Sequence, residues 1–152
     1  APCALDPVIE ASVRSLHAWL SENNARVTFQ ASGGVAVFSD NDHLKEVVKN
    51  LVENAVKFNP KPVKSVSIWV EASEDQAIIR VQDDGPGIPP EEQDKVFSMF
   101  HQIEASFTGQ VEGWGLGLPY VKKVVEAQGG KVELQSKLGE GTTVSVVLPR
   151  RS

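Results

Sequence analysis

The stretch Asn50-Leu51-Val52-Glu53-Asn54-Ala55-Val56-Lys57-Phe58 decides the fold, because it combines an apolar stripe with a polar face at helical spacing. The pattern predicts one long helix, which starts after the N-cap candidates of 39–42 and runs to about Phe58, where Asn59-Pro60 stops it. A stripe this wide must pack on a core. Its apolar members are Leu44, Val47, Val48, Leu51, Val52, Ala55 and Val56.

The opposite face of this helix is polar. Asn50, Glu53, Asn54 and Lys57 stand at i, i+3, i+4 and i+7, within an arc of roughly 100°. Amide and carboxylate oxygens suit Mg²⁺, and a lysine suits phosphate. A solvated helix face explains the same residues equally well when they are taken alone.

Outward from this helix, helical and strand patterns alternate along the chain. Residues 7–24 and 116–128 have helical spacing, and a Gly33-Gly34 turn joins two short strand patterns into a hairpin. Helices interleaved with hairpins predict a two-layer α/β sandwich, with a mixed sheet and helices on one face. The expected strands are 26–31, 35–38, 65–72, 76–83, 131–136 and 142–148.

Composition narrows the function classes. The 152 residues fit one domain, 1–152, and carry a formal net charge of −5 without a basic cluster, so we expect no nucleic-acid partner. No apolar run approaches the roughly 20 residues that span a membrane, so we expect no membrane contact by this domain. The single cysteine, Cys3, fits a reducing, cytoplasmic compartment. The chain begins at Ala and is expected to be part of a longer protein, whose membrane attachment stays open.

Three glycine motifs follow. Asp83-Asp84-Gly85-Pro86-Gly87-Ile88-Pro89 ends an apolar strand, where an Asp can accept a hydrogen bond from an exocyclic amine. Gly113-Trp114-Gly115-Leu116-Gly117-Leu118 precedes a predicted helix, whose free N–H groups attract anions, yet it lacks the Gly-Lys-Ser/Thr of a Walker loop. Gly139-Glu140-Gly141-Thr142 is a turn whose Thr could face a ligand. Each motif alone is also compatible with an ordinary loop or turn.

In this order the motifs resemble the N box and glycine boxes of sensor histidine kinase ATP-binding domains, in the gyrase, chaperone, histidine-kinase and MutL (GHKL) ATPase superfamily. Val96-Phe97-Ser98-Met99-Phe100 resembles the phenylalanine box of the histidine kinases. The resemblance covers about residues 40–149, and 1–39 match only as the usual leading helix and hairpin. It implies the Bergerat fold, with 88–112 as a lid over ATP.

The resemblance also implies roles for the motif residues. Asn54 would bind Mg²⁺, Glu53 would be the general base, and Asn50 and Lys57 would assist the phosphates and the metal. Phe58 would offer a stacking face where Tyr is frequent. The remaining ATP-binding positions are Asp83 for the adenine amine, Gly85, Gly87 and Ile88 beside it, the backbone of Gly113, Gly115, Leu116, Gly117 and Leu118 for phosphates, and Thr142 for the adenine site.

Besides Phe58, two features depart from the family's common pattern. Trp114 replaces a small residue in the phosphate loop, and residues 100–113 contain no Arg or Lys, where many relatives place a basic residue against the γ-phosphate. Only His101 in that segment is potentially cationic. These departures leave open how strongly the triphosphate is bound.

The function implied is transfer of the γ-phosphoryl of Mg-ATP to a His on a separate helical dimerisation domain, and from there to an Asp of a response regulator receiver domain. His17, His43 and His101 are not followed by the Glu or Asp of the acceptor motif, so we expect the acceptor to lie outside this chain, which alone would not autophosphorylate. Two alternatives stay open. One is an anti-sigma-factor-type serine kinase, and the other is a degenerate nucleotide-sensing interaction module.

Overall fold

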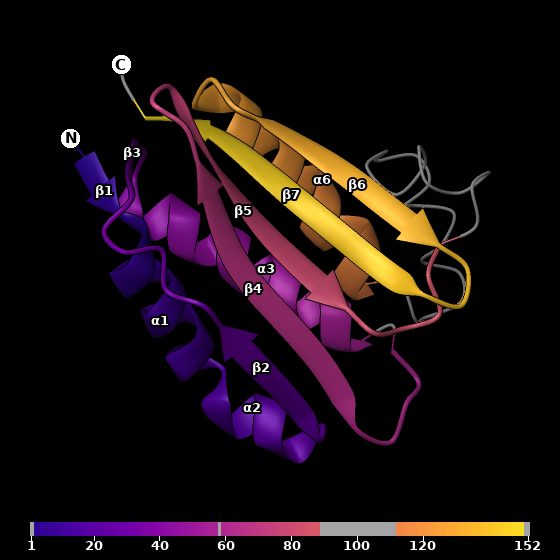
Figure 1. Ribbon diagram of the computed structural model, residues 1–152. Helices are drawn as coiled ribbons and strands as arrows, with labels where there is room; N and C mark the ends of the chain where they lie inside the picture. Colours follow the sequence, from indigo (N-terminus) through magenta and orange to yellow (C-terminus); the bar gives the residue numbers. More distant parts are fainter. Residues whose placement is uncertain (1, 58, 89–111, 151–152) are drawn as a thin grey trace.

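The protein has two layers, a five-stranded sheet and a set of helices that cover one face of it (Figure 1). The structure, a computed structural model, describes residues 2–57, 59–88 and 112–150, with the backbone alone for 112–119. The sheet order is β2-β4-β5-β7-β6; β2 and β4 are parallel and the other pairs antiparallel. The predicted α/β sandwich with a mixed sheet is confirmed. The strands are β2 (Ala25–Phe29), β4 (Lys64–Ala72), β5 (Gln76–Asp83), β6 (Lys131–Lys137) and β7 (Gly141–Pro149).

The long helix α3 (Asn41–Lys57) is the centre of the core, as its apolar stripe predicts. All seven stripe residues are buried. α3 packs against the sheet and between α1 (Leu5–Ser15) and α6 (Glu112–Ala127). Its polar residues therefore lie on the side of the helix that the core does not use.

Apolar residues at alternate positions of the strands form the other half of the core. Val66 and Ile68 of β4 and Ile79 and Val81 of β5 point to the helices and are almost fully buried. The opposite face of the sheet is polar, and there Arg80 donates to Glu71 at 2.6 Å and to Ser145 at 2.8 Å. This two-sided pattern is typical of an antiparallel sheet that has one covered face.

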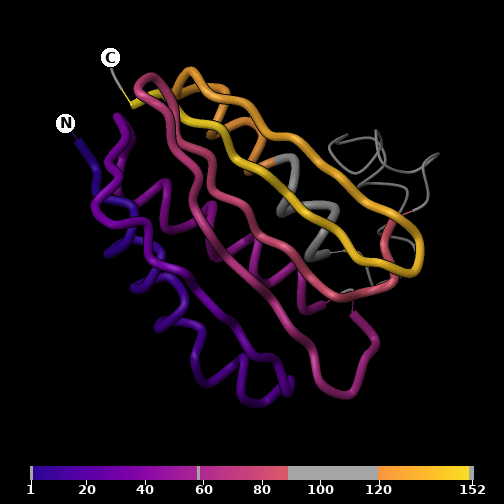
Figure 2. The backbone as a smooth tube through the Cα atoms, viewed as in Figure 1, coloured from indigo at the N-terminus to yellow at the C-terminus, as the bar shows by residue number. Residues whose placement is uncertain are grey.

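α3 and α6 run in opposite directions. Gln128, directly after α6, accepts a hydrogen bond from the backbone N–H of Asp40, directly before α3 (3.2 Å). At about 1.5 Å per residue, the two helices have nearly the same length of about 25 Å. The first turn of α6 therefore lies beside the last turns of α3. The backbone trace shows α3 behind β4 and β5, on the covered face of the sheet (Figure 2).

The predicted hairpin within residues 1–39 is wrong. β2 pairs in parallel with β4, whereas β3 (Ala36–Phe38) pairs antiparallel with a strand that was not predicted, β1 (Pro2–Ala4). Gly33 and Gly34 both have positive φ and turn the chain away from β2. The carboxylate of Asp6 holds this turn by accepting from the N–H groups of Ser32 (2.9 Å) and Gly33 (3.2 Å).

Two predicted helix boundaries also differ. The helix expected over 7–24 breaks at Leu16 into α1 and α2 (His17–Glu22). The helix expected to begin at Leu116 begins at Glu112, so the glycine segment 113–117 forms its first turns and is not a loop before it. Glycine weakens an isolated helix, and packing of α6 against α3 outweighs that local preference. None of the described helices has the length and apolar character that crossing a bilayer requires.

Candidate functional site

Four chain segments that carry predicted site residues meet at one end of the molecule. They are the end of α3, the end of β5, the start of β7 and the start of α6 (Figure 1). The strand register brings two of them together, because β5 and β7 are antiparallel neighbours with Gln82 opposite Thr143. The fold thus assembles motifs that are far apart in the sequence.

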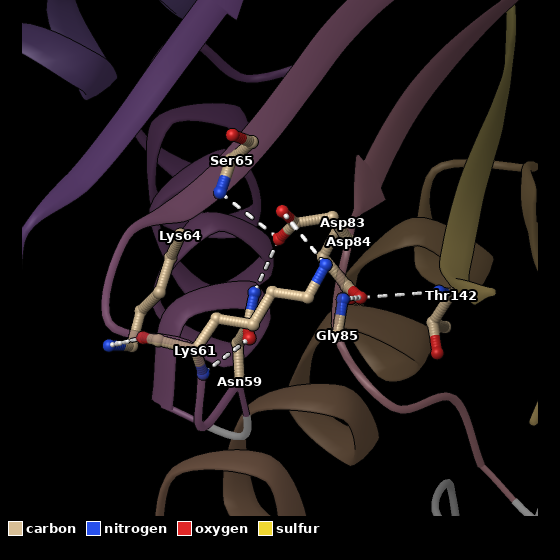
Figure 3. Close-up of polar contacts among 8 residues, drawn as sticks. All are labelled: Asn59, Lys61, Lys64, Ser65, Asp83, Asp84, Gly85 and Thr142. Atoms are coloured by element: carbon tan, nitrogen blue, oxygen red, sulfur yellow. Dashed lines mark hydrogen bonds and ion pairs between the residues drawn. The ribbon is translucent and has the colours of Figure 1, made fainter. Parts of the chain in front are cut away.

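Asp83 is held rigidly at the end of β5. Its Oδ1 accepts hydrogen bonds from the N–H groups of Gly85 (2.9 Å) and Thr142 (3.2 Å), as Figure 3 shows. Within the described part of the chain, its Oδ2 accepts no hydrogen bond. Burial raises the pKa of this carboxyl, and the two N–H donors oppose the rise only in part. One oxygen is thus used to orient the side chain, and the other can accept from a ligand.

Two glycines are required by close backbone packing around Asp83. A Cβ on Gly141, which has φ +100°, would lie 2.2 Å from the carbonyl oxygen of Asp83. A Cβ on Gly87, which has φ +81°, would lie 2.2 Å from the carbonyl oxygen of Lys137. Side chains cannot be accommodated at such distances. The loop after β5 and the β6–β7 turn are therefore in direct backbone contact. The N–H of Gly139 also donates to the carbonyl of Pro86 across this contact, at 2.8 Å.

Thr142 lies under this contact and is 7% exposed. Its hydroxyl is 2.8 Å from the Ser136 hydroxyl, which also accepts from the N–H of Ile88 (2.7 Å). Ser136 was not predicted as a site residue, since it lies in β6 outside every motif. The hydroxyl pair joins the start of β7 to the residue where the lid was expected to begin.

A second acidic residue, Asp84, has no predicted role but has many partners. Its Oδ1 accepts from Asn59 Nδ2 (2.6 Å) and from the N–H of Ser65 (3.1 Å), and its Oδ2 lies 3.5 Å from Lys61 Nζ (Figure 3). Desolvation acts to raise the pKa of Asp84, but these donors together outweigh it and lower the pKa below its ordinary value. Asn59 was interpreted only as a helix stop. The sequence feature that could have pointed to Asp84 is the pair of adjacent acidic residues Asp83-Asp84.

The polar face of α3 is only partly committed to the protein itself. Asn50 Nδ2 donates to the carbonyl of Glu46 at 2.8 Å, while Glu53 and Asn54 are half-buried and Lys57 is exposed. Asn54 Nδ2 is buried and has no hydrogen-bond partner among the described residues. A buried donor left unpaired costs about 1–3 kcal/mol. Asn54 therefore fits a position that is completed by a polar ligand.

Some predicted residues cannot be placed. Phe58, the phenylalanine box and residues 89–111 of the expected lid lie outside the described residues. Of Gly113, Gly115, Leu116, Gly117 and Leu118 the structure describes the helical backbone, which places them at the N-terminal end of α6. Within the described ranges, no three His, Cys, Asp or Glu side chains gather as a metal site.

Comparison with known proteins identifies this arrangement. The family model for the histidine kinase-, DNA gyrase B- and HSP90-like ATPases matches residues 39–152. The chain is 37% identical over 135 residues to the circadian input-output histidine kinase CikA of Synechococcus elongatus. It is 36% identical over 111 residues to the sensor protein SrrB of Staphylococcus aureus. These matches cover 88% and 73% of this chain but only 18% and 19% of the relatives, so the chain spans less than a fifth of their length.

Solved structures agree with the sequence comparison. The mycobacterial sensor histidine kinase MprB is similar with a TM-score of 0.79 at 29% identity, covering 99% of this chain and 97% of that one. The catalytic domain of the histidine kinase ThkA, in a nucleotide-free form, is similar with a TM-score of 0.83 at 26% identity, covering 99% and 95%. The chain therefore belongs to the histidine kinase-, DNA gyrase B- and HSP90-like ATPase family, as an ATP-binding catalytic domain of the histidine kinase type.

Proposed function

We propose that this chain binds Mg-ATP and transfers the γ-phosphoryl group to a His on a separate helical dimerisation domain, from which it passes to an Asp of a response regulator. The observation that carries the proposal is the geometry of Asp83. Its Oδ1 is fixed by two backbone N–H groups, and its Oδ2 accepts no hydrogen bond within the described residues. An oriented carboxylate with one available oxygen is suited to accept the exocyclic amine of adenine.

The phosphate end of the site would lie between α3 and α6. The first N–H groups of a helix have no partner inside the helix, so the start of α6 at Glu112 suits an anion. On α3, the Asn54 amide is half-buried and incompletely paired. Its oxygen would bind Mg²⁺, which prefers oxygen ligands together with substrate phosphates. Lys57, which is exposed one turn further, would contact phosphate.

ATP supplies the γ-phosphoryl group, and the chain's residues position it and handle the proton. Glu53 is one residue from Asn54 on the same face of α3, and we assign it the role of general base for the imidazole N–H of the acceptor His. Catalysis of phosphoryl transfer consists mainly of positioning and charge stabilisation. The remaining parts of the proposal are the helical acceptor domain and the receiver domain as partners, and a cytoplasmic location, where ATP is abundant.

The experiment mixes this chain with the separately expressed helical acceptor domain of its parent, Mg²⁺ and ATP labelled at the γ-position. We expect acid-labile label on the acceptor domain, and we expect Asn54→Ala to abolish it. Because Asn54 Nδ2 has no described partner, the same variant should lower the free energy of unfolding by less than about 1 kcal/mol.

His43→Ala is the matched control, since His43 is exposed on the same helix. It should transfer label at the wild-type rate. Acid-stable label on a Ser would instead favour the serine kinase alternative. A chain that binds no nucleotide at millimolar concentration would refute the proposal.

A further inference from the structure

Two residues close to Asp83, Asn59 and Asp84, make none of the nucleotide contacts proposed above. Asn59 follows α3 and is 3% exposed, and Asp84 follows Asp83 in the chain. The 2.6 Å hydrogen bond from Asn59 Nδ2 to Asp84 Oδ1 joins residues 25 positions apart (Figure 3). This bond connects the helix with the polar face to the strand with the adenine-site carboxylate.

Every polar atom of the Asn59 side chain is used in this connection. Asn59 Oδ1 accepts from the N–H of Lys61 at 3.0 Å, while Nδ2 donates to Asp84. Asp84 Oδ1 also accepts from the N–H of Ser65 in β4 at 3.1 Å. The pair therefore joins three segments: the end of α3, the start of β4 and the end of β5.

The pair also touches Asp83 through Gly85. A Cβ on Gly85 would lie 3.1 Å from Asp83 Oδ1 and 3.5 Å from Asn59 Cγ, so the two side chains flank the same α-carbon. Asp83 and Asp84 share one planar peptide unit, and the N–H of Gly85, the residue after Asp84, donates to Asp83 Oδ1 at 2.9 Å. A displacement of Asp84 therefore reaches the Asp83 carboxylate both through the backbone and through this hydrogen bond.

We infer that Asn59 and Asp84 form a positioning clasp for the nucleotide site. The clasp holds the Asp83 carboxylate and the last turn of α3 at the separation that an adenine nucleotide requires, and thereby sets the selectivity for adenine. The inference rests on the proposed function, because it assumes that Asp83 receives the adenine amine. Neither clasp residue touches the nucleotide, and both act through Asp83 and α3.

The polarity of the pair permits a sharp test by exchange. In Asp84→Asn, the amide oxygen takes the place of Oδ1 and accepts from both Asn59 and Ser65, so the bond between positions 59 and 84 is kept and only the ion pair with Lys61 is lost. In Asn59→Asp, two carboxylates face each other and the bond between positions 59 and 84 is lost. In the double variant N59D/D84N, the carboxylate at 59 accepts from the N–H of Lys61 and from the N–H₂ group of the amide at 84, while the N–H of Ser65 loses its acceptor. The bond between positions 59 and 84 is thus present again, with donor and acceptor exchanged.

The measurement is the dissociation constant of the purified chain for ADP and for inosine diphosphate, by titration calorimetry with Mg²⁺. The base of inosine diphosphate carries a carbonyl where adenine carries the amine. The ratio of the chain's affinities for ADP and inosine diphosphate therefore reports the contact of the amine with the Asp83 carboxylate. We expect Asn59→Asp to weaken ADP binding about tenfold and to reduce the preference for ADP. We expect Asp84→Asn alone to keep both, and the double variant to recover most of what Asn59→Asp loses, as coupled partners should. Lys61→Ala is the control: it removes only an exposed ion pair and should stay within about twofold of wild type.

The outcomes separate the clasp from the proposed function. If the wild type binds no ADP, or binds both nucleotides equally, the adenine role of Asp83 fails and the clasp with it. If the wild type prefers ADP and Asn59→Asp keeps both affinity and preference, the clasp alone is refuted. If Asn59→Asp does not fold, the double variant decides: a folded double variant without the wild-type preference for ADP overturns the inference.

Discussion

Replacing Gly141 by Ala would place a methyl group against the backbone of Asp83. Its Cβ would lie 2.2 Å from the Asp83 carbonyl oxygen and 3.4 Å from Oδ1, and the residue has φ +100°. The start of β7 must therefore move away from the end of β5, and the hydrogen bond from the N–H of Thr142 to Asp83 Oδ1 lengthens or breaks. The perturbation thus acts on stability and on the orientation of Asp83 together.

Gly139→Ala is the matched control for this variant. Gly139 lies two residues earlier in the same turn with φ +83°, but a Cβ there meets nothing within 4 Å. Both variants bear the cost of a side chain at positive φ, about 1–2 kcal/mol. Only Gly141→Ala adds overpacking, a further 1–3 kcal/mol or about 2–5 kcal/mol in all.

The predicted consequence for binding follows from the same contact. A hydrogen bond to a charged group contributes about 1.5–3 kcal/mol, and about 1.4 kcal/mol corresponds to a factor of ten in affinity. Gly141→Ala should therefore weaken ADP binding about tenfold or more, while Gly139→Ala should bind ADP like the wild type. Urea unfolding and titration calorimetry measure the two quantities. Equal losses of stability and of affinity in both variants would refute the close approach of Gly141 to Asp83.

The further predictions concern the charge of Asp83 and the tryptophan of the glycine segment, Trp114. Burial raises the folded-state pKa of Asp83, so its contribution to stability is present below the unfolded pKa and is lost as pH rises through the folded pKa. Asp83→Asn should therefore raise the free energy of unfolding of the ligand-free chain at about pH 7 and have no such effect in acid, as measured by urea unfolding. ADP affinity should fall as pH drops through this raised pKa, and calorimetry showing no such fall would contradict the adenine role. ADP should also change the tryptophan fluorescence through Trp114, and Trp114→Phe should remove the change although Trp19 and Trp69 remain; a wild-type signal that is flat at saturating ADP would exclude Trp114 from the nucleotide site.

The sequence predicted well whatever depends on local periodicity. The seven stripe residues of α3 are all buried, β5 has the predicted bounds, and the two-layer class follows from the order of helices and hairpins. The order of the motifs also led to the family, which the comparisons confirm. Such features are visible in a single chain because a helix or strand shows its buried face every few residues.

Features that depend on pairing between distant segments were not predictable in this way. The partner of β3 is a strand of three residues, Pro2–Ala4, too short to show a period, and the glycines of 113–117 argue against the helix that packing against α3 imposes. In the same way, Asp84 and Asn59 had the composition of an ordinary turn and an ordinary helix stop.

By itself, the sequence determined which residues face the core and which motifs the chain carries. Tertiary structure alone decided that Gly85 and Thr142 donate to one oxygen of Asp83, and that Asn59 joins the end of α3 to the end of β5. The physical reason is that a hydrogen bond depends on distances of about 3 Å between atoms, whereas the hydrophobic pattern of a segment depends only on which of its faces is buried. Local pattern therefore specified the elements, and their packing specified the site.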